Sequence, residues 1–164
     1  ISAKKNGLAS DAAYDEAIRN MKQLNDKGAM IMNKYSIRSA TDITGFGLLG
    51  HAMKMADGSQ VSMQIKAAAI PLIKDVMGLI DLGCIPGAAF RNQEFCETGI
   101  HHDEAVTYNQ KMLLHDAQTS GGLLMCARPD VAENIVSELK AEGYLSSTII
   151  GEVVERKDKS VYTS

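Results

Sequence analysis

The sequence predicts an α+β fold in which helices flank a layered, mixed β-sheet. Helix-like and strand-like segments intermix along the chain and do not follow a repeating pattern, which favours a layered α+β domain. The chain has 164 residues, of which 45% are hydrophobic and 23% charged. A chain of this size buries roughly two thirds of its unfolded surface, so we expect one domain with its own core.

The first third of the chain contains two predicted helices and a strand. Ser10 is placed to cap a helix over residues 11–24, in which apolar side chains recur on one face at Ala13, Ala17, Met21 and Leu24. Acidic residues early in this segment and a lysine late in it complement the helix dipole. A second helix is expected over residues 26–34, followed by a strand over residues 37–40.

The middle of the chain predicts a glycine-rich helix, a strand and a further helix. The glycine-rich helix covers residues 45–56 and is expected to end at Gly58 as its C-terminal cap. Apolar and polar residues alternate over residues 61–65, which indicates a strand with one buried face. A proline at position 71 suits the first turn of a helix over residues 71–82.

The last part of the chain predicts a long loop and then regular structure. Residues 83–99 contain Gly, Pro, Asn and charged residues that interrupt every periodicity, so a loop is expected there, and long loops are often functional. A buried strand is expected over residues 122–127 and a helix over residues 129–141. Residues 148–155 and 161–162 are expected to pair as a terminal hairpin.

Composition argues against several classes of protein. The formal charge is −3 and the isoelectric point is near 5.8, without a Lys/Arg cluster, which is not the charge pattern of a nucleic-acid binder. No apolar stretch approaches the ~20 residues of a membrane span. Three cysteines without C-x-x-C spacing suggest reduced thiols, so we expect a cytoplasmic protein that contacts neither nucleic acid nor membrane.

The run from Gly45 to Gly50 reads G-x-G-x-x-G, but it does not predict a dinucleotide site. That fingerprint requires an apolar strand running into the first glycine and an acid about 20 residues later to bind a ribose hydroxyl. No Asp or Glu lies between Asp57 and Asp75. A Walker A motif is also absent, since no Gly-Lys-Ser or Gly-Lys-Thr occurs.

Asp42 lies just before this glycine run and has two interpretations. A carboxylate beside a helix N-terminus competes with a phosphate for the same positive end, unless a divalent cation lies between them. Asp42 is therefore a candidate ligand of a divalent cation such as Mg²⁺. From the residues alone, capping the helix that follows is the favoured alternative, because Asp is a common N-cap residue.

Three glycines within six positions also require a reason, because each costs about 1 kcal/mol relative to alanine inside a helix. Gly47 and Gly50 are three apart and share a face, so we expect them to allow close packing. Gly45, at the helix start, is suited either to packing or to the close approach of a ligand or of another domain. The cluster Thr119-Ser120-Gly121-Gly122 is either a plain turn or a phosphate-binding or domain-facing loop.

Several motifs together resemble one enzyme family, the selenophosphate synthetases (selenide, water dikinases), which belong to the aminoimidazole ribonucleotide synthetase-like superfamily. The similarity extends in the family's order over almost the whole chain. The matching stretches are residues 1–9, Thr41-Asp42-Ile43-Thr44-Gly45-Phe46-Gly47-Leu48-Leu49-Gly50-His51, Ile85-Pro86-Gly87 with Arg91-Asn92, and Asp116-Ala117-Gln118-Thr119-Ser120-Gly121-Gly122-Leu123-Leu124. Two positions depart from the family pattern: Ala88 replaces a glycine and Ala117 a proline.

The resemblance implies a single C-terminal domain, residues 1–164, of a larger two-domain, ATP-dependent enzyme, with the C-terminal fold of the superfamily. Such an enzyme makes selenophosphate, AMP and phosphate from ATP, selenide and water, and is expected to form a homodimer. The family's reactive Cys or selenocysteine and its partner Lys lie in the N-terminal half. An N-terminal Ile1 also suggests an excised domain. We therefore expect no catalytic residue in this chain, which alone would be inactive.

The resemblance also implies roles for particular residues. It makes Asp42 a ligand of Mg²⁺, the expected cofactor, with ATP as substrate. The residues expected to face the nucleotide or its phosphates are Thr44, Gly45, Asn92, Thr119 and Ser120.

Two rival functions remain open. Related ATP-using enzymes of the aminoimidazole ribonucleotide synthetase, hydrogenase-maturation or thiamine monophosphate kinase type share a similar turn, and a non-catalytic interaction module would keep the fold. A zinc site at Cys84, Cys96, His101 and His102 is not expected, because the spacing does not match structural sites. His51 and His115 are expected to pack or to form hydrogen bonds.

Overall fold

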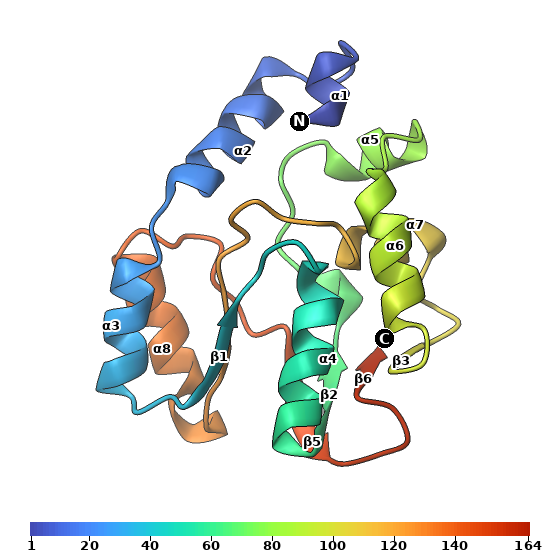
Figure 1. The fold of residues 1–164 in the computed structure, drawn as a ribbon. Coiled ribbons are helices and arrows are strands. Elements are labelled where there is room, and N and C mark those ends of the chain that lie inside the picture. The colour runs from blue at the N-terminus through green and yellow to red at the C-terminus, as the bar shows by residue number, and fades with distance from the viewer.

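Two β-sheets organise the structure, a computed structural model that describes residues 1–164 (Figure 1). The larger sheet has the order β3-β6-β2-β5 and is mixed: β5 runs antiparallel to β2, whereas β6 runs parallel to both β2 and β3. The smaller sheet pairs β1 with β4 in antiparallel fashion. The strands are β1 (Ser39–Asp42), β2 (Val61–Ile65), β3 (Ile100–His102), β4 (Leu123–Cys126), β5 (Gly151–Glu155) and β6 (Val161–Thr163). The predicted α+β class with a mixed sheet is confirmed.

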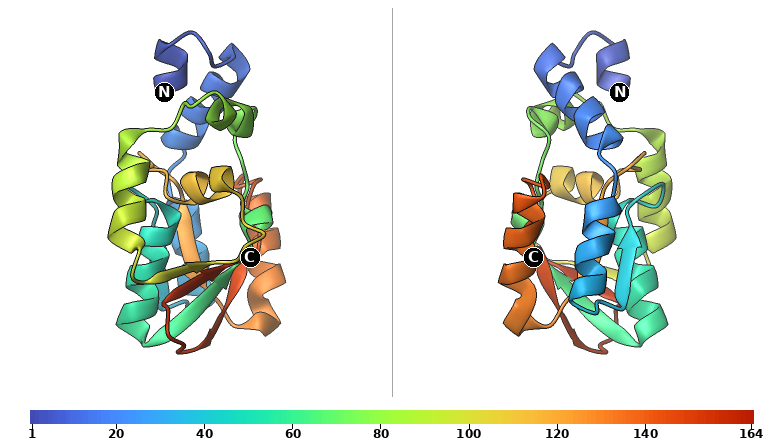
Figure 2. Two further views of the ribbon diagram at one scale, coloured as in Figure 1. Left: turned by 90° about the vertical axis from the view of Figure 1, so that its right-hand side faces the viewer. Right: turned by 90° about the vertical axis from the view of Figure 1, so that its left-hand side faces the viewer.

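Helices lie around both sheets, and α1 and α2 lie together at one end of the molecule in every view (Figures 1 and 2). None of them is long and apolar enough to span a bilayer. The helices are α1 (Ser2–Lys5), α2 (Asp11–Lys22), α3 (Asp26–Lys34), α4 (Gly47–Ser59), α5 (Val76–Asp81), α6 (Gly87–Cys96), α7 (Tyr108–Leu114) and α8 (Pro129–Ala141), with a 3-10 turn η1 (Ala67–Ala69). The predicted helices at α2, α3 and α8 are confirmed, as is the Ser10 cap, whose hydroxyl accepts the backbone N–H of Ala13.

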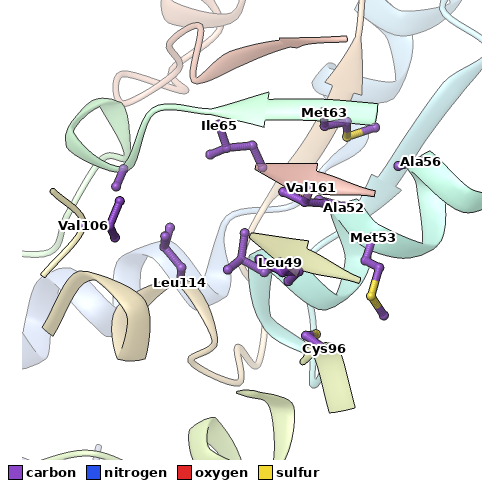
Figure 3. Close-up of a cluster of buried hydrophobic side chains, with 12 residues drawn as sticks. Leu49, Ala52, Met53, Ala56, Met63, Ile65, Cys96, Val106, Leu114 and Val161 are labelled. Carbon is purple, nitrogen blue, oxygen red and sulfur yellow. The ribbon is translucent and has the colours of Figure 1, made fainter. Parts of the chain in front are cut away.

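Helix α4 is the centre of the main core. Its side chains at Leu49, Ala52 and Ala56 are completely buried, and they face β2 and β6 (Figure 3). The fully buried Val161 of β6 lies in the same cluster. A smaller cluster joins α3 to α8. Because α4 is fixed on the sheet by this packing, the loop that leads into it is held at a defined place.

The ends of α4 differ from the predicted ones. The helix begins at Gly47 and ends at Ser59, and its C-terminal cap is Gln60, with φ of 54°. Gly58 therefore lies inside the helix and is not the cap. The left-handed conformation is supported by the Gln60 side chain, whose amide donates to the carbonyl of Asp57 at 2.8 Å. The preceding strand β1 also lies two residues later than the predicted 37–40.

The prediction of a loop over residues 83–99 was wrong, because α6 occupies most of this segment. Its buried positions Ala89, Asn92 and Cys96 follow helical spacing, but two are small or weakly apolar and one is polar, which hid the periodicity. The predicted helix over residues 71–82 is shorter: α5 begins at Val76, and Pro71 lies outside it. Neither the short strand β3 nor helix α7 was predicted.

The predicted terminal hairpin was also wrong. Strands β5 and β6 do not pair with each other, because β2 lies between them and pairs with both. Because β2 has a partner on each side, the backbone hydrogen-bonding groups on both of its edges are paired. If β5 and β6 formed a separate hairpin, these groups of β2 would have no partner.

Candidate functional site

The two glycine-rich loops that flank the small sheet are hydrogen-bonded to each other. The register of β1 and β4 sets Asp42 opposite Leu123. Beyond it, three backbone hydrogen bonds of 2.9–3.0 Å continue the pairing: Ile43 N–H to Gly122 O, Gly121 N–H to Ile43 O, and Gln118 N–H to Thr44 O. The fold therefore brings together two motifs that are more than 70 residues apart in the sequence.

Asp42 is the last residue of β1 and is exposed at this edge. Its carboxylate forms no hydrogen bond or ion pair within the chain, so both oxygens are free. The alternative that Asp42 caps the next helix is wrong, because the cap position of α4 is Phe46. A free, hard carboxylate fits a Mg²⁺ ion, which prefers oxygen ligands. No group of three or more His, Cys, Asp or Glu side chains is arranged around a metal position.

Thr44 is held by His51 of α4. The Nε2 atom of His51 lies 3.1 Å from both the backbone nitrogen and the hydroxyl of Thr44. Because the backbone N–H must donate, Nε2 accepts and the ring proton lies on Nδ1. His51 is therefore a hydrogen-bonding residue, as expected, and it fixes the loop between Asp42 and α4.

Gly45 is exposed, and a methyl group added there would meet no atom within 4 Å. Packing within this chain thus does not require a glycine at this position, which leaves the approach of a ligand or a partner as the remaining interpretation. Asn92, also predicted to face the nucleotide, is buried and not exposed to a ligand. It is only 7% exposed, and its Nδ2 donates to the carbonyl of Gly45 at 2.9 Å and to that of His115 at 3.0 Å.

Gly47 and Gly50 serve close packing, as predicted. Gly47 has φ of +69°, and a methyl group there would lie 2.8 Å from the carbonyl carbon of His115 and 2.9 Å from the carbonyl oxygen of Asp116. A methyl group at Gly50 would lie 2.8 Å from Cβ of Phe46. Only glycine accommodates the first of these contacts in that backbone conformation.

Thr119 and Ser120 lie on the turn that faces Ile43. Thr119 is exposed and Ser120 half-buried, and neither hydroxyl has a hydrogen-bond partner in the chain. Gly121 is required by close approach, since a methyl group there would lie 2.9 Å from the carbonyl oxygen of Ile43. The turn therefore combines a structural glycine with two free hydroxyls.

Asp116, at the start of this loop, is a second unusual carboxyl that was not predicted as a site residue. Burial raises its pKa to about 6, and it accepts a hydrogen bond of 2.6 Å from Nε2 of Gln118. No local pattern marks this residue, because its burial comes from the distant segments that pack around it.

A cavity of about 450 Å³ lies between α6 and β3, away from the Asp42 carboxylate. Two histidines face it, with ring centroids 5.6 Å apart: His102, whose Nδ1 lies 2.7 Å from the Thr163 hydroxyl, and His115, whose Nδ1 lies 2.7 Å from the Lys111 carbonyl. Burial lowers the pKa of both imidazoles, that of His102 to about 4. The lining residues are Phe90, Gln93, Glu94, Cys96, Glu97, Ile100, His102 and His115.

Burial raises the thiol pKa of two of the cysteines, Cys96 and Cys126. Cys96 is 1% exposed, and burial raises the pKa of its thiol to about 11, so the thiol stays protonated at neutral pH. His101 lies on the other face of β3, where it packs against Tyr162 at a centroid distance of 5.6 Å.

Comparison with known proteins places these features in a family. Residues 1–164 match the family described as "AIR synthase related protein, C-terminal domain". Selenide, water dikinase of Porphyromonas gingivalis is 45% identical over 159 residues, which cover 96% of this chain and 45% of that protein. The protein of the same name from Pelobacter propionicus is 40% identical, with coverage of 94% and 44%, and that from Clostridioides difficile is 34% identical, with coverage of 98% and 46%.

A solved structure shares the fold. Thiamine-monophosphate kinase from Stenotrophomonas maltophilia superposes with a TM-score of 0.58 at 14% sequence identity, covering 99% of this chain and 44% of that one. The chain thus spans less than half the length of the relatives and of the solved structure that it matches. From the match over all of its residues, the chain belongs to the AIR synthase related protein, C-terminal domain family.

Proposed function

We propose that this chain is the C-terminal domain of a selenide, water dikinase, an enzyme that converts ATP, selenide and water into selenophosphate, AMP and phosphate. The observation that carries the proposal is the free carboxylate of Asp42 at the edge where two hydrogen-bonded glycine-rich loops meet. The name shared by relatives at 34–45% identity supports the same activity. Because those relatives are more than twice as long, the activity is proposed for the longer protein.

Five residues of the two loops have roles in this proposal. Asp42 would hold Mg²⁺, which neutralises phosphate charge when bound. Thr44, Gly45, Thr119 and Ser120 would face the phosphates, since Gly45 has open space beside it and the hydroxyls of the 119–120 turn are free. Such contacts orient the nucleotide and exclude water.

In this proposal Asn92 acts indirectly, by holding the backbone of the site in place. Its Nδ2 donates to the backbone of Gly45 and of His115, which lie in the segments leading to the two loops. We assign it to positioning Gly45, and not to direct contact with ATP.

The residues that carry out the chemistry would lie in the N-terminal half of the longer protein. The chain offers a single exposed carboxylate at the site and a protonated, buried Cys96 thiol, which is a poor nucleophile. Alone, it should fold but turn over no ATP. We also propose that the longer protein is a cytoplasmic homodimer.

Phosphorus NMR of the full-length protein under anaerobic conditions tests this proposal. With Mg-ATP and selenide, we expect AMP, orthophosphate and a new selenophosphate signal, and none of these without selenide. Formation of ADP instead would favour another ATP-using member of the superfamily, such as a thiamine monophosphate kinase, a hydrogenase-maturation enzyme or an aminoimidazole ribonucleotide synthetase. No turnover with any nucleotide would favour a non-catalytic interaction module.

A further inference from the structure

All three phenylalanines of the chain are substantially exposed, although aromatic side chains normally dominate protein cores. The exposed fractions are 49% for Phe46, 46% for Phe90 and 43% for Phe95. Phe46 and Phe95 contact each other with ring centroids 5.2 Å apart. They form an aromatic pair that is about half exposed at the surface of the chain.

Two polar side chains complete this surface. The ring of His51 packs edge-on against Phe46 at 5.9 Å, and the ammonium of Lys54 lies 5.2 Å from the centroid of Phe95. Lys54 is exposed and takes part in no ion pair. We call these four residues the Phe46 patch.

Helix α4, which follows Phe46, contains a glycine that leaves room for the Phe46 side chain. Gly50 lies inside α4, where glycine costs about 1 kcal/mol relative to alanine. A methyl group at Gly50 would lie 2.8 Å from Cβ of Phe46, so the glycine makes room for the base of that side chain. A residue that destabilises the helix thus makes room for a ring that is half exposed. This arrangement is explained if the exposed part of the ring contacts another polypeptide.

The patch adjoins the candidate site. Phe46 directly follows Gly45, and Phe95 lies on α6, the helix whose Asn92 donates to the Gly45 carbonyl. Asp42, whose carboxylate is free, lies four residues before Phe46, so a polypeptide that covers the patch also lies beside the candidate site.

We propose that the Phe46 patch is the surface on which the remaining half of the longer protein docks, through apolar side chains flanked by a carboxylate that pairs with Lys54. This inference rests on the proposed function, which makes the chain one domain of a protein more than twice as long. A second copy of this chain is a poorer occupant. A two-fold contact centred on the patch would bring two Lys54 ammonium groups together, and like charges in such a contact oppose association.

Hydroxyl-radical footprinting of the full-length protein tests the inference, with Phe90 as an internal reference. The three rings have nearly equal exposure in this domain. Docking should therefore slow the oxidation of Phe46 and Phe95 by about fivefold or more relative to Phe90, because a packed interface excludes water. Equal oxidation of all three rings would overturn the proposal.

Matched variants of the full-length protein give a second readout. Phe46→Ser and Lys54→Glu should each restore oxidation of Phe95 and increase protease cleavage between the two halves, whereas Phe90→Ser should change neither. Equal effects of Phe46→Ser and Phe90→Ser would contradict the placement of the surface. Dimerisation of residues 1–164 that Phe46→Ser abolishes would identify a second copy as the occupant and would also overturn the proposal.

The same samples separate this inference from the proposed function. Selenophosphate formation without protection of Phe46 and Phe95 would overturn the docking surface and leave the function intact. Protection of both rings without selenophosphate would support the docking surface and count against the function.

Discussion

The side-chain amide of Asn92 donates to the backbone carbonyl of Gly45 at 2.9 Å. Its Nδ2 makes a second hydrogen bond, to the carbonyl of His115, so one buried side chain on α6 links the segments that enter the two glycine-rich loops. Backbone hydrogen bonds also join the two loops directly to each other. The position of Asp42 relative to the 118–121 turn thus depends on α6 as well as on the small sheet.

Replacing Asn92 should therefore weaken the fold and the site together. Asn92→Ala leaves two carbonyl groups without their donor in a buried place, which costs about 1–3 kcal/mol of unfolding free energy. Asn92→Asp keeps the shape but places an acceptor against two acceptors, so it should cost at least as much. Urea denaturation of residues 1–164 measures both. Asn20→Ala, on the exposed face of α2, should stay within about 0.5 kcal/mol of the parent, and an equally small effect at Asn92 would contradict the linking role.

Gly47 and Gly58 both lie in α4 but should respond oppositely to alanine. At Gly47 an added methyl group would collide with the backbone of His115 and Asp116, and the left-handed backbone conformation there disfavours alanine. Gly47→Ala should therefore destabilise the fold by about 2–4 kcal/mol. At Gly58 nothing lies within 4 Å, so Gly58→Ala should stabilise by about 0.5–1 kcal/mol. Thermal or urea unfolding of the two variants checks the signs, and a tolerated Gly47→Ala would show that this close approach is not required.

Local patterns were sufficient to predict much of the fold. Strand β2 alternates apolar and polar residues, and Pro129 and Ser10 mark helix starts, so these elements appear within one or two residues of their predicted bounds. The glycine-rich loops were recognised from their motifs, and backbone hydrogen bonds join them in the structure.

Features that depend on long-range packing were missed. Helix α6 buries Asn92 against backbone carbonyls that belong to other segments, so its inner face does not read as apolar. The pairing of β2 between β5 and β6 cannot be seen from a local alternation of residues. The burial of His102 and Asp116, and hence their shifted pKa values, arises from the same distant contacts.

The buried His102 should make stability depend on pH. Burial, helped by the nearby His115, Lys111 and His101, lowers the pKa of its imidazole from 6.5 to about 4. The unfolded chain therefore binds the proton first as the pH falls. The stability contributed by neutral His102 is fully present above pH 6.5 and is lost as the pH falls toward 4.

Variants must be compared to isolate this effect, because Asp116 makes stability depend on pH in the opposite direction. Its pKa is raised in the folded chain, whereas that of His102 is lowered. The stability difference between the parent and His102→Gln should shrink by about 1–3 kcal/mol between neutral pH and pH 4. Urea unfolding at a series of pH values gives the result, and parallel curves for the parent and His102→Gln would contradict the burial argument.

Asp42 is the residue on which the metal proposal depends. Its carboxylate is exposed and unpaired, so Asp42→Asn should leave the stability of residues 1–164 within about 0.5 kcal/mol of the parent. In the full-length protein the same change should weaken apparent Mg²⁺ affinity by about 10- to 100-fold or more, because an amide oxygen carries no charge to offset the metal and its phosphates. Excess Mg²⁺ should restore part of the activity. Asp158→Asn, also exposed, is the matched control and should leave the Mg²⁺ dependence unchanged. A full-length Asp42→Asn protein with normal activity and normal Mg²⁺ dependence would show that the free carboxylate at the end of β1 serves another purpose.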